Sequence, residues 1–179
     1  MKVSNKDRFG FLFVSGSVYR RIPIFRHAKA CEIFLRSLDA YRRKFQFRVH
    51  AYALMPEHYH FLAWFPPGGR FTDFLRDFKS LVGKEIIAWL REEGLEVLLT
   101  RFESKRRPQR AKDARYCVLQ HGNYVKELAG SKILWQKIMY IHENPVRMGI
   151  ASTPEAYAYS SAGICAGTGP SLVKVDILK

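Results

Sequence analysis

Two histidines one position apart, His58 and His60, have the type and spacing that could hold a catalytic metal ion. In a strand, alternate side chains point to the same face, so the two Cα atoms would lie roughly 6.5–7 Å apart. Two imidazoles can then converge on one divalent ion and leave its other coordination positions free for substrate oxygens. Such a pair can also be structural or accidental, and the spacing alone leaves both interpretations open. The remaining histidines lack a partner of this kind and are expected to be exposed or hydrogen-bonded: His27, His50, His121 and His142.

The charge of the chain indicates a polyanionic partner. Thirty Lys and Arg against sixteen Asp and Glu give a formal net charge of +14. The charged residues of 151–179 cancel, so the whole excess lies in residues 1–150. Nucleic acid is the commonest partner of such a field. Aromatic residues lie among the basic ones, as stacking on unpaired bases requires. A basic globular protein without a nucleic-acid partner is the alternative that charge alone leaves open.

The basic residues are densest in the segment 101–115, which also has the least regular pattern of the chain. Only Glu103 and Asp113 oppose its positive charges. We therefore predict a DNA-binding segment. Its seven basic side chains are Arg101, Lys105, Arg106, Arg107, Arg110, Lys112 and Arg115.

Length and cysteine content exclude several other classes. The 179 residues suffice for one packed domain. No apolar stretch is long enough to span a bilayer, and the first residues do not form a signal peptide. Cys31, Cys117 and Cys165 are odd in number and far apart, which indicates neither a disulfide framework nor a thiolate zinc site. We expect free thiols in a reducing cytoplasm and no membrane association.

Hydrophobic periodicity predicts the elements that must position the histidines. Alternation predicts a strand over 8–18 and a hairpin of two strands, 47–55 and 58–65, broken at Pro56. Helical spacing predicts three helices, over 28–45, over 71–93 with a stop at Gly94, and over 131–144 with Ser131 as cap and Pro145 as stop. Residues 95–102 are the next strand candidate, and a short extended piece follows at 115–120.

The order β-α-β-β-α-β with one further helix predicts an α+β protein. The arrangement is a ferredoxin-like antiparallel sheet with helices on one side. We expect one catalytic domain over residues 1–150. A loop-rich tail over 151–179 would pack on this domain or extend from it.

Three segments resemble the REP-associated tyrosine transposases, members of the single-tyrosine HUH superfamily. HAYALMPEHYHFLAWF at 50–65 resembles the family signature AYVLMPNHVHLL. LWQKIMYIHENPVRMGI at 134–150 resembles Q-K-L-x-Y-I-H-x-N-P-V-R-x-G-L and is the more specific of the two catalytic segments. PEAYAYSSA at 154–162 resembles the tail P-E-D-Y-P-W-S-S-A. The segments occur in the family order, so the resemblance covers nearly the whole chain and implies the HUH nuclease and transposase fold.

This resemblance implies a reaction. In such enzymes a tyrosine attacks a phosphodiester of single-stranded DNA, forms a 5′-phosphotyrosine link and frees a 3′-hydroxyl. Tyr140 occupies the position of that nucleophile. His58, His60 and Asn144 occupy the positions of the metal ligands, and Mg²⁺ or Mn²⁺ suits them. Tyr140 and Asn144 share a helix face at i and i+4, and Gln136 lies one turn earlier as a candidate outer partner.

Other details of the reaction stay open in the sequence. No residue stands out as the general base, since His142 should face away from Tyr140, and metal-bound water is an equal candidate. Glu57 replaces the family's asparagine before the first histidine. A carboxylate there could approach the metal ion or face solvent, and we expect it to face solvent. Residues 101–115 are also more basic than the family pattern, which would reflect different DNA contacts.

The expected partner is single-stranded DNA that forms hairpins from palindromic repeats, and the expected location is the bacterial cytoplasm, at the nucleoid. The protein would be a monomer, or a homodimer with Tyr140 acting in trans. The main alternative function is a domesticated, non-catalytic protein that binds single-stranded or hairpin nucleic acid. A rolling-circle initiator or relaxase and a small-molecule metallohydrolase fit the short chain and its charge less well.

Overall fold

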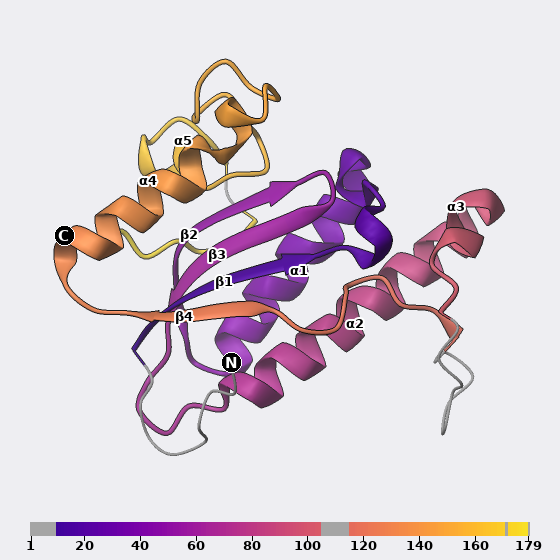
Figure 1. The fold of residues 1–179 in the computed structure, drawn as a ribbon, viewed down its shortest axis with the longest axis horizontal. Coiled ribbons are helices and arrows are strands. Elements are labelled where there is room, and N and C mark those ends of the chain that lie inside the picture. Colours follow the sequence, from indigo (N-terminus) through magenta and orange to yellow (C-terminus); the bar gives the residue numbers. More distant parts are fainter. Residues whose placement is uncertain (1–9, 105–114, 171, 179) are drawn as a thin grey trace.

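A single antiparallel sheet organises the molecule (Figure 1). The computed structural model describes residues 10–104, 115–170 and 172–178. The strands lie in the order β2-β3-β1-β4, with every neighbouring pair antiparallel. Because β3 lies between β1 and β2, the β1–α1–β2 unit is split, as in ferredoxin-like folds. The α+β class and the antiparallel sheet are therefore confirmed. The strands are β1 (Phe11–Ser17), β2 (Arg48–Met55), β3 (His58–Trp64) and β4 (Tyr124–Leu128).

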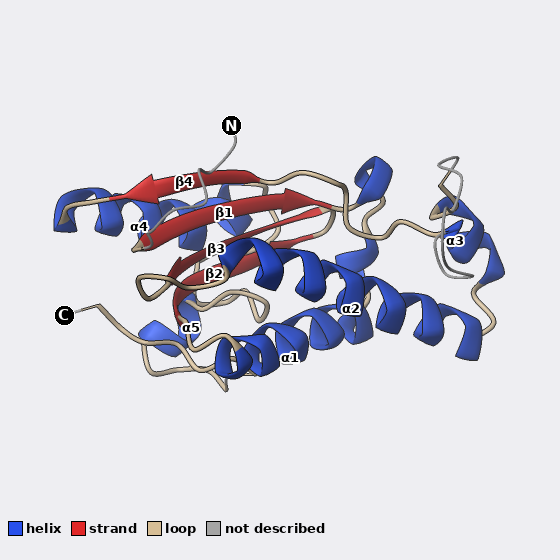
Figure 2. Cartoon of the chain, turned by 90° about the horizontal axis from the view of Figure 1, so that it is seen from below, coloured by secondary structure: helices blue, strands red, loops and turns tan. Residues whose placement is uncertain are grey.

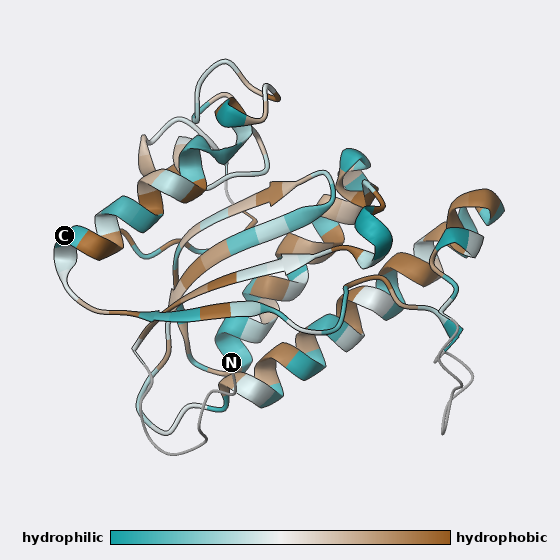
Figure 3. Cartoon of the chain, in the orientation of Figure 1, coloured by the Kyte–Doolittle hydropathy of each residue, from teal (hydrophilic) through white to brown (hydrophobic). Residues whose placement is uncertain are grey.

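Helices α1 (Ala28–Lys44) and α2 (Phe71–Glu92) cover one face of the sheet (Figure 2). The core beneath them is aromatic: the Phe34 ring lies 4.8 Å from that of Tyr59 and 5.0 Å from that of Phe78, measured between centroids. Figure 3 shows hydrophilic and hydrophobic residues alternating around α2, as expected of a helix with one buried side. Both helices agree with the periodicity of the sequence.

Helix α4 (Ser131–Arg147) packs on the opposite face of the sheet. Its apolar residues Leu134, Ile138 and Ile141 contact a second core that includes Phe13 and Leu62. The expectation that all helices lie on one side therefore holds for α1 and α2 but is wrong for α4. Periodicity shows that a helix has a buried side, but it does not show which face of a sheet that side will cover.

The predicted fourth strand was placed in the wrong segment. Residues 95–102 contain a short helix, α3 (Glu96–Arg101). The fourth strand is β4, which begins at Tyr124, 22 residues after Phe102. Leu99 and Phe102 are buried at a helical spacing of three, while Val97 is 82% exposed. A short apolar run fits a strand and a helix equally well, so the sequence pattern was ambiguous there.

Helix α4 also begins and ends differently from the prediction. Gly130, with a φ of 87°, is the N-cap, and Ser131 is the first helical residue, with no side-chain capping bond. The helix continues through Pro145 to Arg147. Proline removes one backbone donor, but the next turn still closes through hydrogen bonds from Met148 N to Asn144 O and from Ile150 N to Pro145 O.

The segment after α4 runs along the free edge of β2. Three backbone hydrogen bonds connect it to β2: Leu54 N to Tyr159 O, Ser161 N to Tyr52 O, and Asp176 N to Val49 O. The short helix α5 (Ala162–Cys165) lies between these contacts. A covered edge strand is protected from pairing with other chains. Over the described residues, none of the helices combines the length and apolar character needed to cross a bilayer.

Candidate active site

The two histidines of β3 lie side by side on the face of the sheet that α4 covers. The ring centroids of His58 and His60 are 4.9 Å apart. In the strand register, His60 is flanked by Ser15 of β1 and Ala53 of β2. Cross-strand neighbours share a face, so two small side chains flank the imidazole.

Helix α4 brings Tyr140 next to His60. The ring of Tyr140, which is half-buried, lies 5.6 Å from that of His60 between centroids. Phe13 supports both groups, since it stacks on His60 at 5.6 Å and meets Tyr140 edge-on at 6.1 Å. A strand histidine and a helix tyrosine, 80 positions apart in the sequence, therefore share one aromatic cluster.

Asn144 lies one helical turn beyond Tyr140 and is buried, at 8% exposure. Gln136, one turn before Tyr140, is exposed. In the described part of the chain, no three of His, Cys, Asp and Glu form a cluster that could hold a metal ion. A metal site at the two imidazoles would draw its further ligands from other groups, and the sequence resemblance implies the Asn144 amide.

The environment keeps both imidazoles in the neutral form that binds metals. Burial, helped by His58 and Lys137, lowers the pKa of His60 to about 3. Burial also lowers the pKa of His58, although Glu57 opposes this shift. Within the described residues, the buried Nδ1 of His60 has no hydrogen-bond partner. A buried ring nitrogen without a partner is costly unless a ligand satisfies it, so the pair fits a metal ion.

Glu57 orients the first histidine, a role that sequence reasoning missed. Its Oε1 lies 3.1 Å from Nδ1 of His58 and 3.8 Å from an Nη of Arg21. The expectation that it faces solvent is therefore wrong. A carboxylate that accepts the Nδ1 proton fixes the tautomer and leaves Nε2 free, as carboxylates behind metal-bound histidines do. Its position next to His58 in the sequence was the available signal.

Two cationic side chains lie near the ring of Tyr140. Lys137 Nζ lies 4.6 Å from the centroid of the Tyr140 ring and 4.5 Å from that of Phe13. The guanidinium of Arg147 lies 5.6 Å from the Tyr140 ring and forms an ion pair with Glu143 at 2.6 Å. Spacings of three and seven from Tyr140 place both on its helix face, which was the signal in the sequence. Cations there could neutralise a bound phosphate.

His142 points away from the cluster, as its helical position predicts. It is buried, and its Nε2 lies 2.8 Å from Oγ of Ser161. Burial lowers its pKa to about 4, against a small opposing effect of Glu155. Ser161 also accepts a bond from the backbone N–H of Tyr52, so this histidine connects α4 to the tail and to β2. It holds the helix in place and does not reach Tyr140.

The predicted DNA-binding segment is only partly described. Arg101 ends α3 and is exposed, and Arg115 pairs with Glu103 at 2.6 Å. The Arg115 guanidinium also lies 5.8 Å from the ring of Tyr116. The other predicted residues lie outside the described residues: Lys105, Arg106, Arg107, Arg110 and Lys112.

The fold has a counterpart among solved structures. A REP-associated tyrosine transposase bound to a REP hairpin matches 100% of this chain and 94% of its own, with a TM-score of 0.66 and 16% identity. A protein from Deinococcus radiodurans R1, named as a candidate transposase, matches 80% of this chain and 96% of its own, with a TM-score of 0.47 and 12% identity. No family profile matches the sequence, and a search of curated proteins finds no match. The first likeness shows that this chain has the fold of a tyrosine transposase, as the three sequence segments predicted.

Proposed function

We propose that this protein is a metal-dependent transposase that cuts and rejoins single-stranded DNA at hairpins formed by palindromic repeats. The observation that carries the proposal is the position of Tyr140, whose ring lies 5.6 Å from that of His60. The likeness to a transposase bound to a REP hairpin supports the same substrate class. Acting on chromosomal DNA, the protein would work in the cytoplasm, at the nucleoid.

His58, His60 and Asn144 are the residues that would hold the metal ion. Two neutral imidazoles and an amide oxygen suit Mg²⁺ or Mn²⁺ and leave positions for phosphate oxygens. Bound there, the ion would act as a Lewis acid on a phosphoryl oxygen of the scissile phosphate. The unpartnered nitrogen of His60 and the carboxylate behind His58 support this assignment.

Tyr140 is the proposed nucleophile. Its phenolic oxygen attacks the phosphorus atom and forms a new O–P bond, while the bond from phosphorus to the 3′-oxygen breaks. The leaving oxygen takes up a proton and becomes a 3′-hydroxyl, and the DNA stays linked to the protein as a 5′-phosphotyrosine. Attack by another 3′-hydroxyl reverses these steps and rejoins a strand.

The side chains around Tyr140 have supporting roles. Lys137 and Arg147 would hold phosphate oxygens of the strand, since both cations lie within 6 Å of the tyrosine ring. Phe13 keeps the rings of His60 and Tyr140 in place. Tyrosine and histidines of one chain come together, so a monomer could carry the complete set and Tyr140 would act in cis.

A covalent adduct tests the proposal. The purified protein is incubated with a single-stranded oligonucleotide that carries the palindromic repeats flanking its gene, with Mg²⁺ or with EDTA, and resolved on a denaturing gel. We expect a protein–DNA band with Mg²⁺ only. Tyr140→Phe should lose this band and still bind the oligonucleotide. Tyr124→Phe is the matched control, because Tyr124 also meets Phe13 edge-on, at 6.2 Å, but is 60% exposed.

The outcomes separate the two functional classes. An adduct that survives Tyr140→Phe would overturn the assignment of the nucleophile. Tight, metal-independent binding without an adduct, on oligonucleotides that carry both flanking repeats, would instead identify a non-catalytic nucleic-acid-binding protein.

A further inference from the structure

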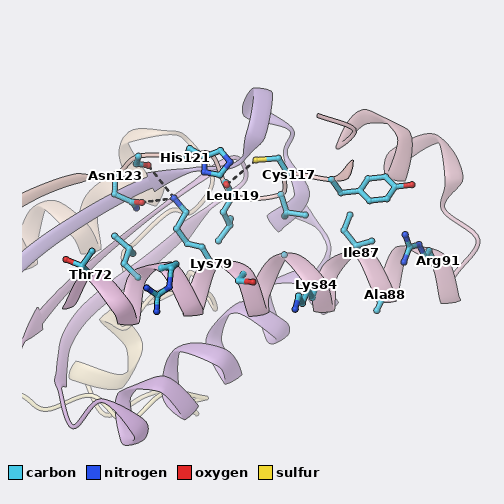
Figure 4. A pocket seen from close by; sticks show the side chains of 17 residues that line it. Thr72, Lys79, Lys84, Ile87, Ala88, Arg91, Cys117, Leu119, His121 and Asn123 are labelled. Carbon is cyan, nitrogen blue, oxygen red and sulfur yellow. Dashed lines mark hydrogen bonds between the residues drawn. The ribbon is translucent and has the colours of Figure 1, made fainter. Parts of the chain in front are cut away.

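A groove of about 790 Å³ lies between α2 and the segment 116–123, apart from the candidate active site (Figure 4). The α2 residues that line it recur at intervals of three and four, from Thr72 to Arg91, and so form one face of the helix. That face spans roughly 28 Å, since a helix rises about 1.5 Å per residue. The groove is therefore long enough for an extended ligand.

The far wall of the groove is fixed in place. Lys79 Nζ donates hydrogen bonds to the carbonyl oxygen of Gln120 and, at 2.8 Å, to Oδ1 of Asn123. Asn123 Nδ2 in turn donates to the hydroxyl of the buried Tyr59 at 2.9 Å. Figure 4 shows Lys79 reaching across from α2 toward Asn123. These bonds hold the wall in place at Gln120 and Asn123. A surface that is already fixed before binding lowers the entropic cost of binding.

The lining of the groove is positive. The described residues that line it include four cationic side chains and no carboxylate. Arg76 is paired with Asp73 and Asp77 of its own helix. Lys84 and Arg91 are exposed, and neither forms an ion pair within the described residues. These two side chains are therefore available to a ligand that carries negative charge.

The floor of the same groove is apolar and has an aromatic rim. Leu75, Ile87, Val118 and Leu119 line it. The guanidinium of Arg91 lies 5.3 Å from the ring of Tyr116, which also lines the groove. Cations beside apolar and aromatic surface suit an unpaired strand, because its phosphates and its bases are both exposed. Duplex DNA offers only its phosphates to such a surface.

The groove reaches the end of the sheet where the candidate active site begins. Gln120, which lies between the lining residues Leu119 and His121, donates a backbone N–H bond to Ser17 of β1, and Ser17 pairs with His58 on its other side. Gln120 and His58 thus flank the same residue of β1, about 10 Å apart at the usual spacing of neighbouring strands. A strand leaving the histidines could pass around this end of the sheet.

From these observations we infer that the groove binds unpaired DNA that flanks the cleavage site. Phosphates contact Lys84 and Arg91, and bases lie against Tyr116 and Ile87. The identity of the strand rests on the proposed function, but binding by the groove can be measured without cleavage. This second surface lies on the α2 side of the sheet, opposite Tyr140.

The test compares affinities for a labelled oligo(dT) strand by fluorescence anisotropy. Lys84→Glu/Arg91→Glu should weaken binding by at least about tenfold and lower the slope of log affinity against log salt by about 1 to 2. Lys29→Glu/Arg43→Glu on the exposed side of α1 changes net charge equally and should have a much smaller effect. Equal losses of affinity in both double variants would show a general charge effect and overturn the inference that the groove binds DNA.

Two further variants test the shape and the stacking. A Cβ added at Gly83 meets no atom within 4 Å, so Gly83→Phe should fill the groove without disturbing α2 and should also weaken binding of oligo(dT). Tyr116→Ala should weaken oligo(dT) about tenfold and leave duplex binding unchanged. Unchanged oligo(dT) affinity in the filled variant, or equal losses for duplex and oligo(dT) in Tyr116→Ala, would contradict the inference.

The adduct assay distinguishes this inference from the proposed function. Lys84→Glu/Arg91→Glu should still form the adduct on a minimal hairpin without flanking nucleotides, and should need more of a substrate that has them. If neither the original protein nor any variant forms an adduct, the anisotropy measurements still test whether the groove binds oligo(dT). If adducts form and the double variant binds oligo(dT) like the original protein, the groove alone is overturned.

Discussion

The two faces of the sheet differ in the size of the side chains that one strand presents. Toward α1 and α2, β3 presents Tyr59 and Phe61, which are fully buried in an aromatic core. Toward α4 the same strand presents His58 and His60, with Ser15 and Ala53 beside the second. The strand thus presents bulky rings on one face, the filled face, and two imidazoles among smaller side chains on the other, the histidine face, where Leu62 packs in the second core. A rigid, filled face can hold polar groups in place on the opposite face.

The largest expected effect on stability comes from the filled face. Phe78→Ala should lower the free energy of unfolding by about 3–5 kcal/mol, because it removes a fully buried ring that packs on Phe34 and Phe74. Tyr140→Phe on the histidine face should change the free energy of unfolding by less than about 1 kcal/mol. Urea unfolding followed by circular dichroism measures both. Similar losses in the two variants would contradict the division between the faces.

Metal binding at the histidine face should stabilise the protein only when both histidines are present. At 100 times the dissociation constant, Mn²⁺ should raise the free energy of unfolding by about 2.7 kcal/mol. His60→Ala should lose this gain. His27→Ala should keep it, because its ring packs on Trp89 of the other face, 5.6 Å away. Thermal melts with and without Mn²⁺ measure the stabilisation. Equal stabilisation of His60→Ala and His27→Ala by Mn²⁺ would contradict the proposed metal site.

A glycine on β1 tests how tightly the filled face is packed. A Cβ at Gly16 would lie 2.3 Å from the ring of Tyr59, so Gly16→Ala should cost about 1–3 kcal/mol of stability. Gly10→Ala is the control, since a Cβ there meets nothing within 4 Å. Chemical denaturation of both variants gives the comparison. A Gly16→Ala protein as stable as the control would show that the ring moves aside easily.

The attachment of the tail should contribute less to stability than the packing around Phe78 and Gly16. Burial raises the pKa of Asp39. Hydrogen bonds from the Lys174 N–H and from Arg42 lower it and outweigh burial, so the pKa in the folded state lies below that in the unfolded state. This stabilisation is then present above the unfolded pKa, about 3.9, and is lost as the pH falls through the folded value. Asp39→Asn should cost about 1 kcal/mol at pH 7.

Denaturation at several pH values checks this prediction. The difference between Asp39→Asn and the original protein should shrink below about pH 4. A difference that stays constant from pH 7 to pH 3 would mean that the charge of Asp39 does not contribute.

Elements with a strong period were predictable from the sequence. The hairpin of β2 and β3 follows from alternation, and this alternation also placed His58 and His60 on one face. Helices α1 and α2 follow from their apolar spacing. β4 was missed because it is an edge strand whose first residue, Tyr124, is 60% exposed, so its burial pattern alternates weakly.

What depended on tertiary packing could not be predicted. Spacing placed Tyr140 and Asn144 on one side of a helix, but the face of the sheet that this side would cover is decided by the contacts of Ile138 and Ile141 with the second core. The groove beside α2 arises from a segment that begins 25 residues after the last α2 residue of its lining, and Lys79 joins the two. Neither arrangement has a local signal.

Mapping the attachment point of the DNA tests the central claim most directly. The sequence has nine tyrosines, but trypsin cleaves after Lys137 and Arg147, so Tyr140 is the only tyrosine in the peptide 138–147. The adduct formed with Mg²⁺ is digested with nuclease and trypsin and analysed by mass spectrometry. We predict a nucleotide joined through phosphate to this peptide. A nucleotide on any other tyrosine peptide, or cleaved DNA with no protein attached, would contradict the account.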